Sequence, residues 1–342
     1  MLTGGLGTTV RGMAVSDDTM RLPTAADIDR AAGTLAGVAL HTPLLTSPVL
    51  DALTGARVFL KAETLQRTGS FKFRGAYNKL ASLAAEHRRN GVVAFSSGNH
   101  AQGVAAAARL FDMPAVIIMP DDAPLPKRER TAALGAEVVL YNRETGDREA
   151  IAREMAADRG AVLVPPYDDP MIIAGQGTAG LEIADDMAAM NLAPDAVIVT
   201  ASGGGLTAGI ALAMKARHPH ASIYTAEPQN FDDHARSFRS GSRETNQARS
   251  GSICDALLSP SPGKMTFEIN RSLVGEGLWA SDEEVARAVA FAFRELKLVV
   301  EPGGAVGLAA LLAGKLDARD QVVVVVLSGG NVDPELFYRL VA

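Results

Sequence analysis

The sequence predicts an α/β protein whose open, mostly parallel sheets carry helices on both faces. Two observations predict this fold class. Short apolar runs rich in Val and Ile alternate with Ala-rich helical stretches, and small-residue turns separate them. Uninterrupted Val and Ile runs are typical of parallel strands that are buried on both faces. The length of 342 residues favours two lobes over a single core.

The expected strands are β-branched and end in small residues. They are Arg57–Lys61, Val92–Phe95, Ala115–Met119, Glu137–Leu140, Ala196–Thr200, Ser222–Ala226 and Gln321–Leu327. The expected helices lie between strands and are His100–Phe111, Lys127–Leu134, Gly177–Met190 and Leu206–Arg217. A further helix begins after Ser281, because the three acidic residues that follow stabilise a positive helix N-terminus. The polar segment Arg236–Ser252 is expected to be an exposed loop.

Composition narrows the functional classes. A formal charge of −6 without a basic tract argues against binding to nucleic acid or to an anionic membrane. No apolar run reaches the roughly 18 residues of a membrane span. A single cysteine, Cys254, excludes an internal disulfide and indicates a reducing, cytoplasmic location. Residues 1–20 lack the apolar run of a secretory signal, and we expect a disordered extension there.

The first candidate functional segment is TGSFKFRGA, residues Thr68–Ala76. It places Lys72 between Phe71 and Phe73, directly after a Gly-Ser turn. A lysine that forms a Schiff base needs a partly desolvated site that lowers its pKa, and the two aromatic rings suit this. By itself the segment is weak, because most lysines are solvated.

Two segments follow expected strands and open helices. SSGNHAQG, residues Ser96–Gly103, supplies free N–H groups at a helix N-terminus, which bind a carboxylate or phosphate. An ordinary Ser N-cap explains only one of its residues. TASGGGLTAG, residues Thr200–Gly209, has three successive glycines that can wrap around a phosphate. It also fits a loose dinucleotide fingerprint with Glu227 as the ribose-binding acid, so an NAD-dependent dehydrogenase stays an alternative at this point.

The fourth segment, LSGGN, ends the last expected strand at Leu327–Asn331. The carboxyl ends of parallel strands are where open α/β sheets bind ligands. In this order, GSFKFRGA, SSGNHAQG, SGGGL and LSGGN resemble the threonine/serine dehydratase and serine racemase family, from about His41 to the C-terminus. That family uses pyridoxal phosphate (PLP) and has the tryptophan-synthase-β-like fold, PLP fold type II.

The resemblance implies two lobes with the cofactor in the interdomain cleft. Residues 21–67 plus 167–342 would form the large PLP-binding domain, and 68–166 the small domain that closes on the substrate. A small amino-acid substrate and a homodimer are implied as well. Nothing fits the C-terminal regulatory domain of the biosynthetic dehydratases, so a short form without that control is expected.

The resemblance also implies residue roles. Lys72 would hold PLP as a Schiff base and move the α-proton, with Phe71 packed beside the ring. Asn99 would bond the phenolic oxygen, and Ser328 the pyridine nitrogen. The phosphate would be held by backbone N–H groups of a loop made of Gly203, Gly204, Gly205 and Leu206. The substrate carboxylate would be bound by the turn made of Ser97, Gly98, Asn99 and His100.

A hydroxyl at the pyridine nitrogen, as implied for Ser328, leaves the ring a weaker electron sink than an aspartate would. That favours prompt loss of a β-hydroxyl, so we expect β-elimination of L-threonine or L-serine to a 2-oxo acid and ammonia. The alternatives are 3-hydroxyaspartate or another β-hydroxy amino acid as substrate, and serine-type racemisation. In racemases the serine at the position of Ser97 is the acid/base opposite the lysine. Arg67 and Arg143 are candidate partners for a second substrate carboxylate, and the alternative for each is a solvated surface arginine.

A second resemblance concerns AEPQNFDD, residues Ala226–Asp233. It is similar to a segment that binds a divalent cation in the racemase-like branch of the family. The likeness implies that Glu227, Asp233 and the Phe231 carbonyl ligate Mg²⁺ or Ca²⁺, which prefer such oxygen ligands. Glu227 then becomes a metal ligand in place of a ribose-binding acid. A solvated acidic loop is the alternative.

Overall fold

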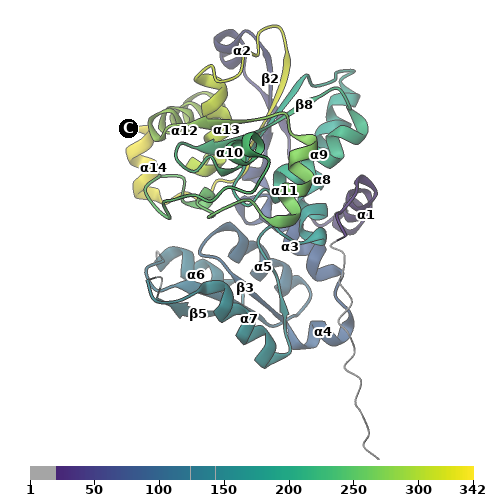
Figure 1. The fold of residues 1–342 in the computed structure, drawn as a ribbon, viewed down its shortest axis with the longest axis vertical. Helices are drawn as coiled ribbons and strands as arrows, with labels where there is room; N and C mark the ends of the chain where they lie inside the picture. Colours follow the sequence, from purple (N-terminus) through teal and green to yellow (C-terminus); the bar gives the residue numbers. More distant parts are fainter. Residues whose placement is uncertain (1–20, 124, 143) are drawn as a thin grey trace, which may run out of the picture.

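The computed structural model describes residues 21–123, 125–142 and 144–342, so the expected extension at 1–20 lies outside the described residues. Two sheets organise the chain (Figure 1). The six-stranded large sheet has the order β1-β2-β10-β7-β8-β9, and the four-stranded small sheet has the order β5-β4-β3-β6. All pairs are parallel except β1 with β2. The predicted open, mostly parallel α/β class is confirmed.

The large sheet consists of β1 (Leu44–Thr46), β2 (Arg57–Ala62), β7 (Ala196–Thr200), β8 (Ser222–Pro228), β9 (Glu276–Ala280) and β10 (Val322–Leu327). The small sheet consists of β3 (Val92–Phe95), β4 (Ala115–Pro120), β5 (Glu137–Tyr141) and β6 (Val162–Leu163). Every strand that the sequence predicted is present. β1, β6 and β9 were not predicted, because each lies at a sheet edge and carries too few β-branched residues for a strand signal.

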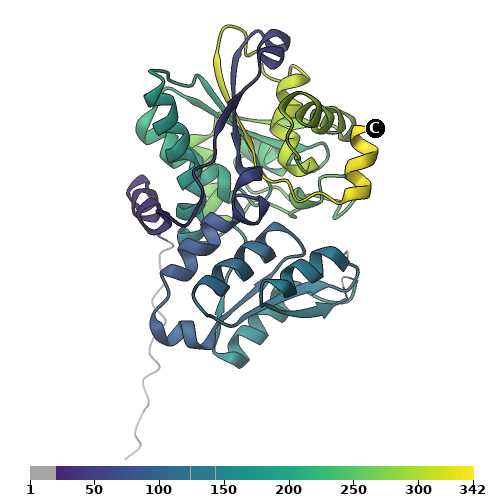
Figure 2. The ribbon, with the colours of Figure 1, turned by 180° about the vertical axis from the view of Figure 1, so that it is seen from behind.

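Helices cover both faces of the large sheet (Figures 1 and 2). Those attached to it are α1 (Ala25–Leu35), α2 (Pro48–Thr54), α8 (Pro170–Ala189), α9 (Gly205–Arg217), α10 (Asp233–Ser240), α11 (Lys264–Leu273), α12 (Asp282–Leu296), α13 (Pro302–Leu312) and α14 (Pro334–Val341). Around the small sheet lie α3 (Lys72–Ala81), α4 (Ala85–Asn90), α5 (Asn99–Leu110), α6 (Leu125–Ala133) and α7 (Arg148–Arg159).

The central strand β10 shows why its valine run is uninterrupted. Val323 and Val325 pack in one core cluster with α12 and α13. Val324 and Val326 pack in another with α8 and α9. Because both faces of the strand are covered, polar residues have no solvent-facing position to occupy.

Two predicted bounds were wrong. α8 begins at Pro170 instead of Gly177, because Asp169 caps it by accepting from the N–H groups of Met171 and Ile172. The segment Arg236–Ser252 is a loop only in its later part, since α10 extends to Ser240. The helix start after Ser281 is confirmed: Ser281 and Glu284 form a reciprocal capping box.

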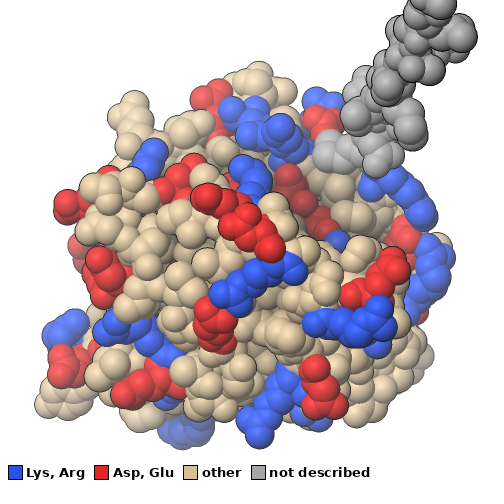
Figure 3. All heavy atoms as spheres, turned by 90° about the horizontal axis from the view of Figure 1, so that it is seen from below, with Lys and Arg blue, Asp and Glu red and all other residues tan. Residues whose placement is uncertain are grey.

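The surface has no dominant charge on the face that Figure 3 shows. Lys and Arg side chains lie interspersed with Asp and Glu over that face. No helix of residues 21–123, 125–142 or 144–342 has the length and hydrophobicity that crossing a membrane requires.

Candidate active site

Lys72 is the first residue of α3, and its ammonium group is enclosed. Its Nζ donates to the Pro166 carbonyl at 2.8 Å and lies 5.1 Å from the centroid of the Phe71 ring. Burial lowers the pKa of Lys72 to about 8, and the Glu301 carboxylate limits the shift. The site therefore has the desolvated lysine that Schiff-base chemistry requires.

The end of β10 is joined to the loop that precedes Lys72. Ser70 forms an antiparallel bridge with Gly329, and the Phe71 N–H donates to the Ser328 carbonyl at 3.2 Å. Ser328 is buried. The first and fourth sequence segments are thus neighbours, although more than two hundred positions separate them (Phe71 and Ser328).

The N-terminus of α5 meets the same point. Asn331 Nδ2 donates both to Asn99 Oδ1 at 2.8 Å and to the Thr68 carbonyl at 2.7 Å. α5 also packs closely on α3, since a Cβ at Gly103 would lie 3.1 Å from the Lys72 carbonyl carbon. The second sequence segment therefore adjoins the first and the fourth.

The glycine loop Gly203–Gly205 follows β7 and opens α9. The Gly203 carbonyl accepts from Thr266 Oγ1 at 2.6 Å and the Gly204 carbonyl from Asn270 Nδ2 at 3.2 Å, both from α11. Gly204 has φ of 90°, and a Cβ there would lie 2.6 Å from the His234 ring. Among the described residues, no backbone carbonyl accepts from the loop's own N–H groups. These free donors suit an anionic group such as a phosphate.

Tyr167, which sequence reasoning missed, links this loop to Lys72. Its ring lies against Gly203, where a Cβ would overlap it, and the preceding residue, Pro166, accepts from Lys72. Burial raises the pKa of Tyr167, and a hydrogen bond with Ser259 opposes that rise. The available signal was an aromatic residue directly after the predicted boundary at 166/167.

The turn predicted to bind a carboxylate precedes and enters α5. Ser97, Gly98 and Asn99 are half-buried, whereas His100 is buried, with Nε2 hydrogen-bonded to the Val164 carbonyl at 2.9 Å. Burial, together with the nearby Lys72 charge, lowers the pKa of His100 to about 3. A neutral imidazole contributes no charge, so a carboxylate here relies on the helix N–H groups.

Glu301 is a second residue that sequence reasoning missed. It lies directly before α13, is buried, and its Oε1 accepts from Asn99 Nδ2 at 2.5 Å. Burial raises the pKa of Glu301 to about 7, and the Asp255 charge contributes. The sequence offered only a lone acidic residue before a Pro-Gly-Gly turn.

These groups fit PLP. The Lys72 amine, the Asn99 amide, the buried Ser328 and the free N–H groups of the glycine loop come from segments that adjoin one another. Leu206, the last predicted phosphate contact, is buried at the start of α9. PLP would supply an electron sink for reactions at an amino acid's α-carbon.

Two of the three predicted metal ligands, Glu227 and Asp233, lie in one buried cluster with His234, which was not predicted. Ligand atoms of Glu227, Asp233 and His234 lie within 4.8 Å of one another. Glu227 accepts from the N–H groups of His234 and Ala235, both at 2.9 Å, and Asp233 Oδ2 has no hydrogen-bond partner among the described residues.

Burial raises the pKa of Glu227, with Asp233 adding to the effect, and burial also raises the pKa of Asp233, to about 7. Two buried carboxylates with a free oxygen suit a hard cation. His234 Nε2 is hydrogen-bonded to the Ser202 carbonyl at 2.8 Å, so the cluster adjoins the glycine loop.

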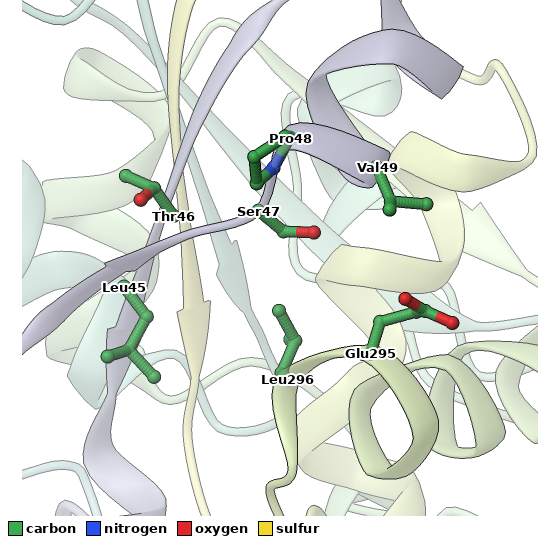
Figure 4. A pocket seen from close by; sticks show the side chains of 7 residues that line it. All are labelled: Leu45, Thr46, Ser47, Pro48, Val49, Glu295 and Leu296. Atoms are coloured by element: carbon green, nitrogen blue, oxygen red, sulfur yellow. The ribbon is translucent and has the colours of Figure 1, made fainter.

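Two surface cavities lie away from Lys72. One of about 240 Å³ is formed by β1, α2 and α12 (Figure 4) and has Leu45, Val49, Glu295 and Leu296 among its lining residues. The other, of about 290 Å³, lies between α1 and α8. Neither cavity contains a residue of the predicted PLP site. That site is defined by the segments that meet near Lys72.

Comparison with known proteins shows the family. A family model described as pyridoxal-phosphate dependent enzyme matches residues 36–329. The chain is 46% identical over 321 residues to the L-threo-3-hydroxyaspartate ammonia-lyase of Pseudomonas sp, covering 94% of this chain and 99% of that protein. It is 42% identical over 318 residues to the L-threonine ammonia-lyase of Thermotoga maritima, covering 93% and 78%.

Solved structures give the same result. The T.th. threonine deaminase superposes with a TM-score of 0.85 at 43% identity, covering 91% of this chain and 99% of that one. Maize serine racemase superposes with a TM-score of 0.88 at 34% identity, covering 93% and 97%. The predicted family and the PLP fold type II are confirmed. The chain belongs to the family of pyridoxal-phosphate dependent enzymes.

Proposed function

We propose that this enzyme is an ammonia-lyase that converts a β-hydroxy amino acid to a 2-oxo acid and ammonia. The convergence of Lys72, Asn99, Ser328 and the glycine loop carries the proposal. The similarity to ammonia-lyases along nearly the whole chain supports it. The dehydrogenase alternative loses its basis, because Glu227 is buried in the carboxylate cluster and does not lie free for a ribose.

The chain's own residues divide the work. Lys72 Nζ would hold the cofactor and take the α-proton, and the N–H groups at the start of α5 would bind the substrate carboxylate. Ser328 would offer a neutral hydroxyl to the pyridine nitrogen, which would favour elimination over long-lived carbanion chemistry. Closure of residues 68–166 over the substrate would exclude water.

L-Threonine and L-serine are the substrates that the sequence predicts, and 3-hydroxyaspartate is the first alternative. Arg148 supports this alternative. Its guanidinium lies 5.7 Å from the centroid of the Phe95 ring, at the end of β3, and its charge also acts on Tyr167. An exposed cation there suits a second carboxylate. Arg67 is committed to the Val38 carbonyl at 2.5 Å, and Arg143 lies outside the described residues.

The test is a 2-oxo-acid and ammonia assay with L-threonine, L-serine, D-serine and both 3-hydroxyaspartate diastereomers, followed by chiral analysis of unreacted substrate. We expect elimination from an L-substrate and no activity in Lys72→Ala. Racemised substrate without 2-oxo acid would replace the proposal with a racemase in which Ser97 acts opposite Lys72. Arg148→Gln should lower kcat/KM for 3-hydroxyaspartate at least roughly tenfold more than for L-serine.

We propose further that Glu227, Asp233 and the Phe231 carbonyl bind Mg²⁺ or Ca²⁺. The unpartnered Asp233 Oδ2 and the raised pKa values of both carboxyl groups support a missing cation. Mg²⁺ should raise the melting temperature of the wild type, and Asp233→Asn should remove that response. Equal responses in the two proteins would exclude the site.

Homodimerisation and a cytoplasmic location also remain proposals. A second copy as partner is supported by exposed apolar side chains on α2, α12 and α14: Val49, Leu53, Phe293 and Tyr338. Leu53→Glu should yield a monomer by light scattering. The free, buried Cys254 agrees with a reducing compartment.

A further inference from the structure

The carboxyl group of Glu301 lies at the predicted PLP site, but the proposed reaction gives it no role. The residue is 5% exposed, and its Oε1 accepts from Asn99 Nδ2 at 2.5 Å. A Cβ at Gly329 would overlap the same oxygen. The carboxyl group therefore fills the space between the start of α5 and the residue that follows Ser328.

The hydrogen bonds of Asn99 fix the direction of its amide. A side-chain amide has one acceptor oxygen and two N–H donors. The oxygen of Asn99 accepts from Asn331 Nδ2 at 2.8 Å, and one N–H donates to Glu301. Asn331 is itself fixed, because its Nδ2 also donates to the Thr68 carbonyl at 2.7 Å.

Rotation of the Asn99 amide by half a turn would be costly. The rotated amide would place the Asn99 oxygen against the Glu301 carboxylate, where two acceptors repel each other. It would also place the Asn99 NH₂ against the NH₂ of Asn331, where two donors meet. The observed direction leaves the second N–H of Asn99 available to an acceptor in the site.

We propose that Glu301 is a positioning residue that orients Asn99, so that its remaining N–H meets the phenolic oxygen of PLP. The inference rests on the proposed role of Asn99 in holding PLP. The new element is that the cofactor contact depends on a carboxylate behind the amide that does not itself hold the cofactor.

A carboxylate serves this purpose better than an amide. It only accepts, so it pairs with one direction of the Asn99 amide, whereas a glutamine offers a donor and an acceptor and pairs with both. Its charge also strengthens the bond from Asn99. The other charged groups that act on Glu301 are Lys72, Lys127 and Asp255, none of which hydrogen-bonds to its carboxyl group among the described residues.

The experiment measures PLP binding instead of turnover. PLP is titrated into PLP-free wild type and into Glu301→Met and Glu301→Gln, and the dissociation constant and the visible band of the bound cofactor are recorded. Loss of a hydrogen bond to a charged group is worth roughly tenfold or more, so Glu301→Met should raise the dissociation constant by about that factor. Glu301→Gln should give a smaller increase and a partly restored band.

A double-mutant cycle with Asn99→Ala shows whether Glu301 acts through Asn99. PLP is titrated well above the Lys72 pKa of about 8, where the amine is neutral with or without the Glu301 charge. If Glu301 acts through Asn99, Glu301→Met should then change the dissociation constant less than about twofold once Asn99 is absent. Additive effects would overturn the inference, because they would show that Glu301 acts on the cofactor or the fold directly.

Two controls separate the possible failures. Glu295→Gln removes an exposed carboxylate near the cavity of Figure 4 and should leave PLP binding unchanged. Circular dichroism checks folding, and if Glu301→Met is unfolded, Glu301→Gln replaces it in the cycle. A wild type that takes up no PLP would refute the proposed function. A wild type that binds PLP, with Glu301 variants that bind it equally well, would refute this inference alone.

Discussion

At the scale of a single residue, two opposing influences set the pKa of Lys72. Burial disfavours its ammonium form, and the Glu301 carboxylate favours it, with a pKa of about 8 as the result. Since only the neutral amine attacks the aldehyde of PLP, the position of this pKa controls how readily the chain takes up its cofactor.

The rate of PLP uptake by PLP-free protein should therefore rise as the pH increases through about 8 and level off above it. A lysine with its ordinary pKa of about 10.4 would keep gaining rate up to that pH. Stopped-flow absorbance from mildly acidic to strongly basic pH measures the midpoint. Glu301→Gln should move the midpoint to lower pH, because it removes the charge that stabilises the ammonium. A midpoint at the ordinary lysine pKa in the wild type would contradict the desolvation of the Lys72 amine.

At the scale of elements, the glycines of α8 lie within the helix. The sequence predicted a helix start at Gly177, yet α8 passes through Gly175–Gly180 without interruption. The glycines allow close approach of backbones instead. A Cβ at Gly175 would lie 2.6 Å from the Arg74 carbonyl on α3, and one at Gly177 would lie 2.8 Å from the Gly209 carbonyl on α9.

Gly209→Ala should destabilise the protein, because its Cβ would lie 2.5 Å from the Ile173 carbonyl and push α9 away from α8. Overpacking of this kind costs about 1–3 kcal/mol. Gly33→Ala on α1 is the matched control, since nothing lies within 4 Å of its Cβ. It should stabilise by about 0.5–1 kcal/mol through helix propensity. Urea unfolding of both variants measures the difference, and equal effects would argue against the helix contact.

On the scale of the whole molecule, an ion pair joins the parts that carry the two sheets. Lys127 on α6 lies 2.8 Å from Asp255 in the 3-10 turn that precedes α11. Both side chains act electrostatically on Glu301, so the pair lies near the PLP site. We expect it to favour the closed arrangement of the two parts.

Lys127→Met should raise KM about two- to fivefold with little change in kcat, since exposed ion pairs are worth at most about 1 kcal/mol. Arg159→Met is the control, because its pair with Glu137 at 2.7 Å lies within the small-sheet part. Steady-state kinetics at low and high salt compare the two variants, and salt should remove the difference between wild type and Lys127→Met. Equal KM values at low salt would show that the pair does not favour closure.

The sequence by itself determined most of the strands, the parallel α/β class and the four segments that meet around Lys72. Buried parallel strands demand β-branched residues, and an anion-binding turn demands small residues at a strand end, so both leave local patterns. Only the tertiary structure decided the helical path through the α8 glycines and the places of Tyr167 and Glu301. Those features depend on backbone approach and hydrogen-bond partners distant in sequence, which no local pattern records. Glu301 and Asn99, for example, lie 202 positions apart.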